Sequence, residues 1–223
     1  MKKFLTRKRD KQRFPVKERR TGIKKEQKLN GTVTPRLARS EKDSEYRRIL
    51  QEKDRFNRKL KFAAFLADRL RKSGVDSVLV GGSAVEMYTN GDFPTADMDI
   101  DVSDLGEAVK LLKNLSFRKT DSLWFNPDLD IAVDLSTKGY SGDVKKLRIL
   151  EVGKYRLKVA GVEDLIVNRL YSAKFWKSNL QRDIEEAAAL LEIFKGKLDN
   201  NYLITIAKKN DVEDLLKAIR ETQ

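Results

Sequence analysis

One segment limits the possible folds of this 223-residue chain more than any other: residues 78–102, VLVGGSAVEMYTNGDFPTADMDIDV. Its apolar start predicts a strand over 75–80 that ends in a tight turn at Gly81-Gly82. A helix is then expected over 83–88, with its N-terminus at the glycines, and a second strand over 98–102. The segment therefore predicts a turn rich in accessible backbone N–H groups between a strand and a helix.

The second strand carries acidic residues at alternate positions, Asp97, Asp99 and Asp101. Alternate residues of a strand share one face, so neighbouring acids lie about 6.7 Å apart. At an effective dielectric of about 20, each such pair repels by roughly 2.5 kcal/mol. Three acids on one face therefore favour a bound cation, and the alternative is the solvated face of an edge strand.

A second acidic stretch follows at residues 129–136, LDIAVDLS. As a strand it places Asp130, Ala132 and Asp134 on one face and only apolar residues on the other. If the two strands are neighbours, Asp134 becomes the third carboxylate beside Asp97 and Asp99. Asp101 is then expected to be a bystander.

The chain contains no histidine and no cysteine. This excludes Ser-His-Asp and Cys-His catalysis as well as thiolate or imidazole zinc sites. Carboxylate oxygens suit magnesium or manganese, which serve phosphoryl and nucleotidyl transfer. Backbone N–H groups, a hydroxyl and a helix N-terminus at Gly81, Gly82 and Ser83 suit phosphates. The residues together indicate chemistry on a nucleoside triphosphate such as ATP.

The positive charge is concentrated near the N-terminus. Residues 1–40 hold fifteen lysines and arginines and three acidic residues, out of a net charge of +13 for the whole chain. We expect residues 1–43 to be a basic arm, disordered when unbound, that contacts nucleic acid phosphates. The alternative is a solvated tail without a specific partner. No membrane span or secretory signal is evident, so a cytoplasmic location is expected.

The remaining pattern predicts an α+β protein with a mixed sheet flanked by helices. We expect a core over residues 44–160 and a helical subdomain over 161–223. Phe175 and Trp176 are expected to pack in the core, with base stacking as the alternative. Further expected elements are a helix over 45–73, a helix over 104–115, strands over 123–125 and 129–136, a hairpin of 148–152 with 156–160, and helices over 162–175, 179–194, 200–208 and 211–221.

These motifs resemble the nucleotidyltransferase superfamily, whose fold is shared with DNA polymerase beta. Its glycine turn matches Gly81, Gly82 and Ser83, its Asp-x-Asp pair matches Asp97 and Asp99, and its third acid matches Asp134. More narrowly, VLVGGSAVEMY, TADMDI and EDLIVNRLYSAKFWKSNLQRDIEEAAALLE are similar to prokaryotic nucleotidyltransferase-like proteins of abortive-infection and toxin–antitoxin modules. The resemblance covers roughly residues 60–220.

The resemblance implies transfer of a nucleoside monophosphate from an NTP to RNA, a protein hydroxyl or a small molecule. Asp97, Asp99 and Asp134 would be catalytic and would hold Mg²⁺ or Mn²⁺. Gly81, Gly82, Ser83 and Arg169 would bind the nucleotide. Asp183 would lie near the cleft, although a surface ion pair with neighbouring cations is the alternative for this residue. A protein partner of the toxin–antitoxin type is also implied.

Two departures from the family pattern stand out. Phe93 occupies a position where relatives often carry an arginine, and Ala84-Val85-Glu86 replaces the Arg-Asp pair of CCA-adding enzymes. The second departure argues against a role in adding CCA to tRNA. The first supports a second hypothesis, in which the chain is a non-catalytic nucleic-acid-binding or toxin–antitoxin partner on a degenerate fold.

Overall fold

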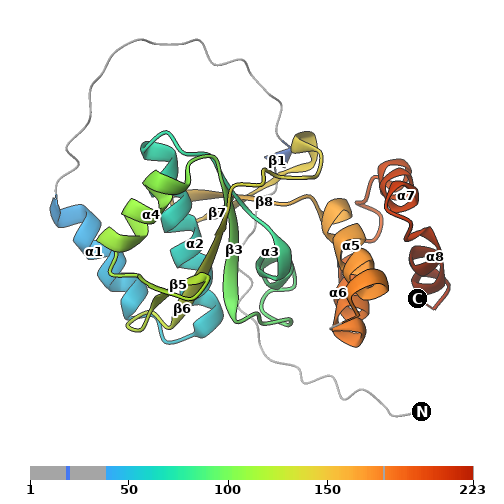
Figure 1. Cartoon of the computed structure of the whole chain (residues 1–223), viewed down its shortest axis with the longest axis horizontal. Coiled ribbons are helices and arrows are strands. Elements are labelled where there is room, and N and C mark those ends of the chain that lie inside the picture. The colour runs from blue at the N-terminus through green and yellow to red at the C-terminus, as the bar shows by residue number, and fades with distance from the viewer. Residues whose placement is uncertain (1–18, 21–38, 178, 223) are drawn as a thin grey trace, which may run out of the picture.

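The computed structural model describes residues 19–20, 39–177 and 179–222, with side chains described from residue 44 onward. Most of the predicted basic arm, residues 1–43, lies outside the described residues. Its disorder and its contact with nucleic acid therefore stay predictions. The described part consists of a mixed sheet with helices on both faces and a group of helices at one end (Figure 1).

The sheet has eight strands in the order β1-β7-β8-β2-β3-β6-β5-β4. Strand β3 lies in its interior, antiparallel to β2 and parallel to β6. The alternative of an acidic edge strand is therefore wrong. The strands are β1 (Arg19–Arg20), β2 (Ser77–Leu79), β3 (Asp97–Val102), β4 (Arg118–Thr120), β5 (Leu123–Asn126), β6 (Ile131–Ser136), β7 (Arg148–Val152) and β8 (Tyr155–Val159).

Helices α1, α2 and α4 cover one face of the sheet, and α3 packs on the other, between the sheet and helices α5 to α8 (Figure 1). None of the helices in the described part of the chain combines the length and apolar character that crossing a bilayer requires. The helices are α1 (Arg39–Leu50), α2 (Arg55–Lys72), α3 (Gly81–Tyr88), α4 (Leu105–Asn114), α5 (Val162–Tyr171), α6 (Leu180–Ile193), α7 (Asn200–Lys209) and α8 (Glu213–Glu221), with a short 3-10 turn η1 (Val144–Lys146) and a π-helical turn η2 (Ser172–Trp176).

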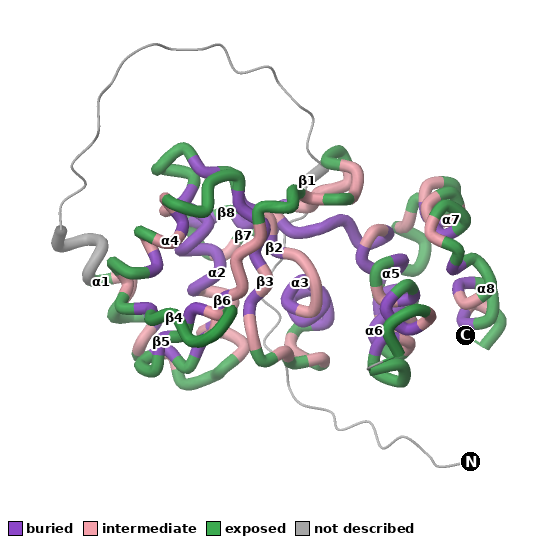
Figure 2. The backbone as a smooth tube through the Cα atoms, viewed as in Figure 1, coloured by how far each residue is buried: buried purple, intermediate pink, exposed green. Residues whose placement is uncertain are grey.

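The core lies between the sheet and the helices, where buried segments of both gather (Figure 2). The apolar positions of β3 follow the predicted alternation, because Met98, Ile100 and Val102 are all buried. They face away from the acids that share the other side of the strand. The expected α+β architecture, with its mixed sheet and C-terminal helices, is confirmed.

The helix expected over 45–73 is two helices. The chain leaves α1 after Leu50 and enters α2 at Arg55, where Asp54 is the N-cap and accepts a hydrogen bond from the Asn57 N–H at 2.8 Å. A side-chain acceptor at this position satisfies one of the free N–H groups that begin a helix. Apolar spacing runs through both helices and hides the break.

The helix expected over 162–175 also ends early. Helix α5 stops at Tyr171, the chain continues through the π-helical turn η2, and Lys177 adopts a left-handed conformation with φ of 54°. Phe175 and Trp176 lie in this turn with 47% and 71% of their surface exposed. The expected core role of these two aromatic residues is therefore wrong.

Candidate active site

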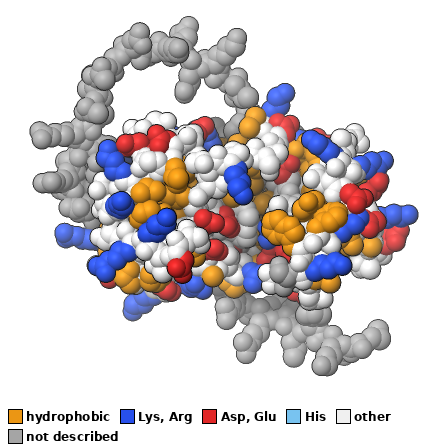
Figure 3. All heavy atoms as spheres, viewed as in Figure 1, with side chains coloured by type: hydrophobic (Ala, Val, Ile, Leu, Met, Phe, Trp, Pro, Cys, Tyr) orange, Lys and Arg blue, Asp and Glu red, His pale blue; other side chains and the backbone are white. Residues whose placement is uncertain are grey.

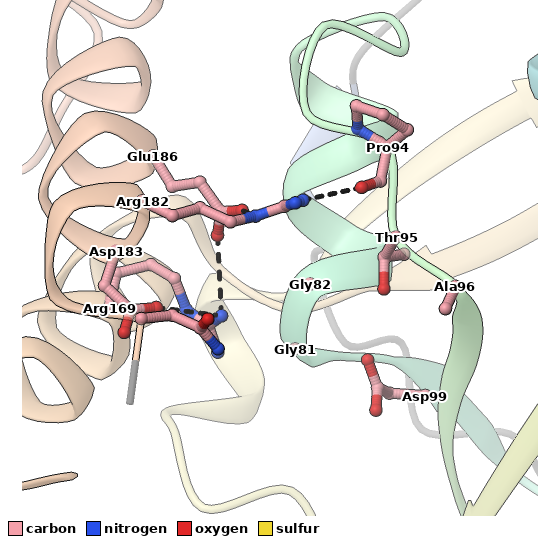
Figure 4. Close-up of a pocket in the computed structure, with 11 residues that line it drawn as sticks. Gly81, Gly82, Pro94, Thr95, Ala96, Asp99, Arg169, Arg182, Asp183 and Glu186 are labelled. Carbon is pink, nitrogen blue, oxygen red and sulfur yellow. Dashed lines mark hydrogen bonds and ion pairs between the residues drawn. The ribbon is translucent and has the colours of Figure 1, made fainter. Parts of the chain in front are cut away.

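An open cleft of about 350 Å³ lies between the sheet and the C-terminal helices. One side is formed by Gly81, Gly82, Asp99 and the 94–96 segment, and the other by residues of α5 and α6 (Figure 4). Figure 3 shows acidic side chains over β3, beside the hollow that separates the sheet from these helices. The cleft thus lies where the predicted glycine turn and acidic strand meet the helical subdomain.

The register of β3 and β6 brings the predicted acids together. Asp99 lies directly opposite Asp134, and Asp97 lies opposite Ala132. Burial raises the pKa of Asp99, and the charges of Asp97 and Asp134 raise it further. We call Asp97, Asp99 and Asp134 the carboxylate wall. The crowding of these like charges is what a bound cation would relieve.

Two other acids of the pattern have different surroundings. Asp130 precedes β6 with φ of 52°, and its carboxylate lies 3.8 Å from Arg55 Nε and 4.0 Å from Arg58 Nη2. The expectation that it shares a strand face with Asp134 is wrong, because the turn before β6 is longer than predicted. Asp101 is buried and accepts a hydrogen bond from the Gly139 N–H at 3.2 Å.

Gly81 allows the glycine turn to approach the carboxylate wall. Its φ is +59°, and a Cβ added there would lie 2.6 Å from Asp99 Oδ2. Real Cβ atoms essentially never lie this close to another atom, so Asp99 or the turn would have to shift. A Cβ on Gly82 would lie 3.4 Å from Thr95 Oγ1, which is close but less severe. The first glycine is therefore required by both conformation and space.

Ser83 ties helix α3 to β3. Its fully buried hydroxyl accepts a hydrogen bond from the Asp99 N–H at 3.0 Å and donates to the Asp97 carbonyl at 3.0 Å. Gly81 and Gly82 line the cleft, whereas Ser83 lies behind them. In this structure Ser83 positions the carboxylate wall from behind. Its predicted contact with phosphate stays a prediction.

A buried ion pair that the sequence pattern did not reveal supports the start of β3. Lys59 and Glu86 are 1% and 2% exposed, and Lys59 Nζ lies 2.5 Å from Glu86 Oε2. The same ammonium donates to the carbonyls of Thr95 at 3.0 Å and Asp97 at 3.4 Å. Thr95 in turn donates its hydroxyl to Asp97 Oδ1 at 3.2 Å. The pair thus fixes the backbone that carries Asp97.

The opposite side of the cleft presents two arginines, Arg169 on α5 and Arg182 on α6, which we call the guanidinium wall. Glu186, 2% exposed, holds both: it lies 3.4 Å from Arg169 Nη1 and accepts from Arg182 Nε at 2.7 Å. Arg182 also donates through Nη2 to the Pro94 carbonyl at 2.6 Å, across the cleft (Figure 4). Arg169 Nε is buried without a hydrogen-bond partner among the described residues.

Asp183 also lines the cleft, 3.5 Å from Arg169. Burial raises its pKa, and the Arg169 charge opposes that rise. Because Asp183 is 6% exposed, the alternative of a surface ion pair is wrong. Sequence reasoning missed Arg182 and Glu186 as members of the site. Their i, i+4 spacing on one helix was the available signal, although it is common in exposed helices as well.

Two further positions lie away from the cleft or at its edge. Lys174 points to the start of α8, and its Nζ lies 3.1 Å from Asp214 in that helix and 3.4 Å from Asp211, which precedes it. Phe93 is partly buried and packs against the core, next to the Pro94 carbonyl that Arg182 reaches. A guanidinium from another element therefore lies beside the position where an arginine was expected.

The donor set of the carboxylate wall fits magnesium, which prefers oxygen ligands. Among the described residues, no three acidic side chains converge closely enough to hold a metal ion by themselves. Magnesium is usually bound through one or two carboxylates together with substrate phosphates and water. The acids in register on β3 and β6 provide such a partial shell, and Asp99 with its raised pKa lies at its centre.

Comparison with known proteins identifies the architecture. No protein-family model matches the sequence. No curated protein matches it either. Among solved structures, an antigenic nucleotidyltransferase-like protein from Paracoccidioides brasiliensis superimposes with a TM-score of 0.51 at 14% identity, over 75% of this chain and 93% of that one. This chain has a nucleotidyltransferase-like fold.

A second structure, of the antibiotic-resistance factor ANT(2'')-Ia, matches at 14% identity over 70% of this chain and 88% of that one, with a TM-score of 0.44. The fold assignment rests on the Paracoccidioides brasiliensis structure, and at 14% identity that likeness leaves substrate and activity open. The abortive-infection or toxin–antitoxin subtype stays a prediction. What the site does must be argued from its own residues.

Proposed function

We propose that this chain is a magnesium-dependent nucleotidyltransferase that moves a nucleoside monophosphate from an NTP to an acceptor hydroxyl. The observation that carries this proposal is the pairing of Asp99 with Asp134 in register, beside a glycine turn that only a residue without Cβ can form. Asp99 of the carboxylate wall and both arginines of the guanidinium wall line one cleft. A polyanion and its counter-ions fit between walls of opposite charge.

Each wall has a distinct role in the proposed reaction. Backbone N–H groups at Gly81 and Gly82 and the guanidinium of Arg169 bind the triphosphate. Arg169 suits this role because its buried Nε lacks a partner among the described residues. Asp97, Asp99 and Asp134 would supply oxygen ligands to magnesium, together with phosphate and water, and the ion would neutralise phosphate charge and lower the pKa of the acceptor hydroxyl.

The transfer itself is an in-line displacement. The acceptor oxygen forms a bond to the α-phosphorus, and the bond from that phosphorus to the α–β bridging oxygen breaks. Pyrophosphate leaves with the bond electrons. The acceptor proton passes to the Asp134 carboxylate and then to solvent. Asp97 and Asp99 keep the reacting groups in place, supported from behind by Ser83 and Lys59.

The acceptor is RNA, a protein hydroxyl or a small molecule in this proposal. The basic arm, residues 1–43, favours nucleic acid because the fifteen lysines and arginines in its first 40 residues attract phosphates. Binding through about five phosphates would give a log-log salt slope of about −4.5. A protein partner of the toxin–antitoxin type and a cytoplasmic location belong to the same proposal.

The test is to incubate the chain with each α-labelled NTP, magnesium, total RNA and cell protein, and to identify what becomes labelled. We expect the double substitution Asp97→Asn, Asp99→Asn to reduce transfer by about 10³-fold or more, equivalent to roughly 4 kcal/mol. Asp101→Asn is the matched control, because Asp101 lies on the same strand but accepts from Gly139. Its transfer rate should stay close to that of the unchanged chain.

Unchanged turnover in the double variant would refute the mechanism. A chain that retains nucleic acid affinity but neither binds nor turns over NTP in magnesium would support the second hypothesis, a non-catalytic binding partner on this fold. Labelled product from the unchanged chain counts against that hypothesis.

A further inference from the structure

Arg182 crosses the cleft and connects its two sides. Its Nε donates to the buried Glu186 carboxylate at 2.7 Å, and its Nη2 donates to the Pro94 carbonyl at 2.6 Å. Figure 4 shows the side chain extended from α6 to the segment before β3. The side chain is nevertheless 46% exposed, so its guanidinium is accessible from the cleft.

The segment that Arg182 contacts leads directly into the carboxylate wall. Lys59 holds the Thr95 and Asp97 carbonyls of this segment, and Ser83 holds the Asp97 carbonyl as well. Lys59 and Ser83 are themselves almost fully buried. The Pro94 contact differs because its donor is partly exposed and belongs to the opposite side of the cleft. It is the point at which a ligand can replace a protein acceptor.

Chemistry favours such a replacement. The carbonyl of Pro94 is a neutral acceptor, whereas a phosphate group is charged and its oxygens accept two parallel N–H bonds from one guanidinium. Glu186 fixes Nε, which orients the rest of the guanidinium toward the cleft. A phosphate chain lying on Gly81 and Gly82 would therefore meet a donor that is already oriented.

We infer that Arg182 binds the phosphate chain of the nucleotide and exchanges its bond to the Pro94 carbonyl for one to a phosphate oxygen. This inference rests on the proposed function for the identity of the ligand. Arg182 thus supplies, from α6, a guanidinium on the phosphate chain beside the position of Phe93. The bond to Pro94 is the contact of the free protein, and it is released when a polyphosphate enters.

The test uses inorganic tripolyphosphate as the probe, with the full chain in magnesium buffer and calorimetry as the measurement. We expect Arg182→Gln to weaken binding by about 10-fold or more, because a charge-assisted contact is lost. Arg182→Lys should retain part of the affinity, since a point charge replaces the fork. Arg220→Gln is the matched control: Arg220 lies on α8 and donates to Asn200 at 2.8 Å.

We expect Arg220→Gln to change the affinity by less than about twofold. A crystal structure with tripolyphosphate should show the Arg182 guanidinium on phosphate and away from the Pro94 carbonyl. If Arg182→Gln lowers the melting temperature but leaves the affinity unchanged, Arg182 only ties the two walls together and the inference is overturned. Failure of the unchanged chain to bind tripolyphosphate overturns it as well.

These outcomes are separable from those of the proposed function. Affinity for tripolyphosphate that depends on Arg182, in a chain that transfers no nucleotide, leaves the inference standing and refutes the enzyme. Nucleotide transfer with affinity independent of Arg182 refutes the inference and leaves the enzyme standing.

Discussion

Each wall of the cleft is backed by one buried glutamate, and the two glutamates differ in what they hold. Behind the carboxylate wall, Glu86 pairs with Lys59, and both are almost fully buried. Behind the guanidinium wall, Glu186 holds Arg169 and Arg182, whose side chains are 17% and 46% exposed. The cation paired with Glu86 is therefore enclosed by the protein, whereas the two cations paired with Glu186 are partly exposed to solvent.

This difference in exposure distinguishes a cation that stabilises the fold from cations that are able to bind a ligand. The Lys59 ammonium donates its hydrogen bonds to Glu86 and to the backbone carbonyls of Thr95 and Asp97. It therefore holds the backbone before β3 in place and cannot reach a ligand. Both arginines are held by Glu186 and line the cleft, although Arg182 also donates to the Pro94 carbonyl and Arg169 to Asn168. Burial of the cation, more than the presence of a glutamate, decides which role a pair has. Four experiments test how the two sides of the cleft differ.

The largest effect is expected from Lys59→Met, which leaves Glu86 buried without its cation. We expect a loss of about 3–5 kcal/mol in the free energy of unfolding, measured in urea. Adding Glu86→Leu should restore most of that loss, because the unpaired charge is removed. Arg182→Met is the control from the other wall and should cost about 1 kcal/mol or less, since its pair is partly solvated. Equal losses for Lys59→Met and Arg182→Met would remove the contrast.

Next in size is Gly81→Ala, compared with Gly153→Ala. Both glycines have φ of +59°, but a Cβ at Gly153 meets nothing within 4 Å, whereas one at Gly81 meets Asp99 Oδ2 at 2.6 Å. The shared conformational cost is about 1–2 kcal/mol. Crowding at Gly81 adds roughly another 1–3 kcal/mol and displaces Asp99. Thermal unfolding measures the difference, and similar losses at both positions would show that Asp99 moves aside freely.

A pH dependence of stability should follow from Asp99. Burial, followed by the charges of Asp97 and Asp134, raises its pKa in the folded state. Protonated Asp99 therefore favours folding: its contribution is fully present below the unfolded pKa of about 3.9 and is lost as pH rises through the folded pKa. Asp99→Asn should thus become more stable relative to the unchanged chain as pH increases from acid toward neutral. A pH-independent difference in urea unfolding would contradict this.

The smallest effect is expected at the end of the guanidinium side, in the π-helical turn that follows α5. Trp176 is 71% exposed, so Trp176→Ala should change the free energy of unfolding by no more than about 0.5 kcal/mol. Phe62, which is fully buried, is the control, and Phe62→Ala should cost about 3–5 kcal/mol. A large loss at Trp176 would mean that this aromatic residue is covered in solution.

Much of the carboxylate wall could be predicted from sequence because its signals are local. Glycines, alternating acids and apolar positions all fall within residues 78–102, and period two fixes which side chains share a face. The prediction of Asp134 required one further assumption, that β3 and β6 are neighbours. The structure confirms it, because the two strands pair and Asp99 lies opposite Asp134. The position of Asp130 was predicted wrongly because this residue has a left-handed backbone conformation, so β6 begins at Ile131 and not at residue 129 as the apolar spacing suggests.

The guanidinium wall and the buried pair could not be predicted in the same way. Lys59 and Glu86 are 27 residues apart on two helices, and Arg182 meets Pro94 across 88 residues. Charged residues on amphipathic helices are normally solvated, so the pattern does not distinguish the few that are buried. Phe175 and Trp176 were misjudged for the converse reason, since apolar residues at helical spacing are normally covered.

The number of residues in the turn that joins β5 to β6 is as important to the site as the identity of the acids themselves. Asn126 accepts hydrogen bonds from the N–H groups of Asp128 and Leu129, and Asp130 adopts φ of 52° before the strand begins. A deletion of one residue here that shifts β6 by one position would turn Asp134 into the core and bring Val133 or Leu135 to face the cleft. Homologous chains that keep every acid but differ in this turn by a single residue would lack the third carboxylate.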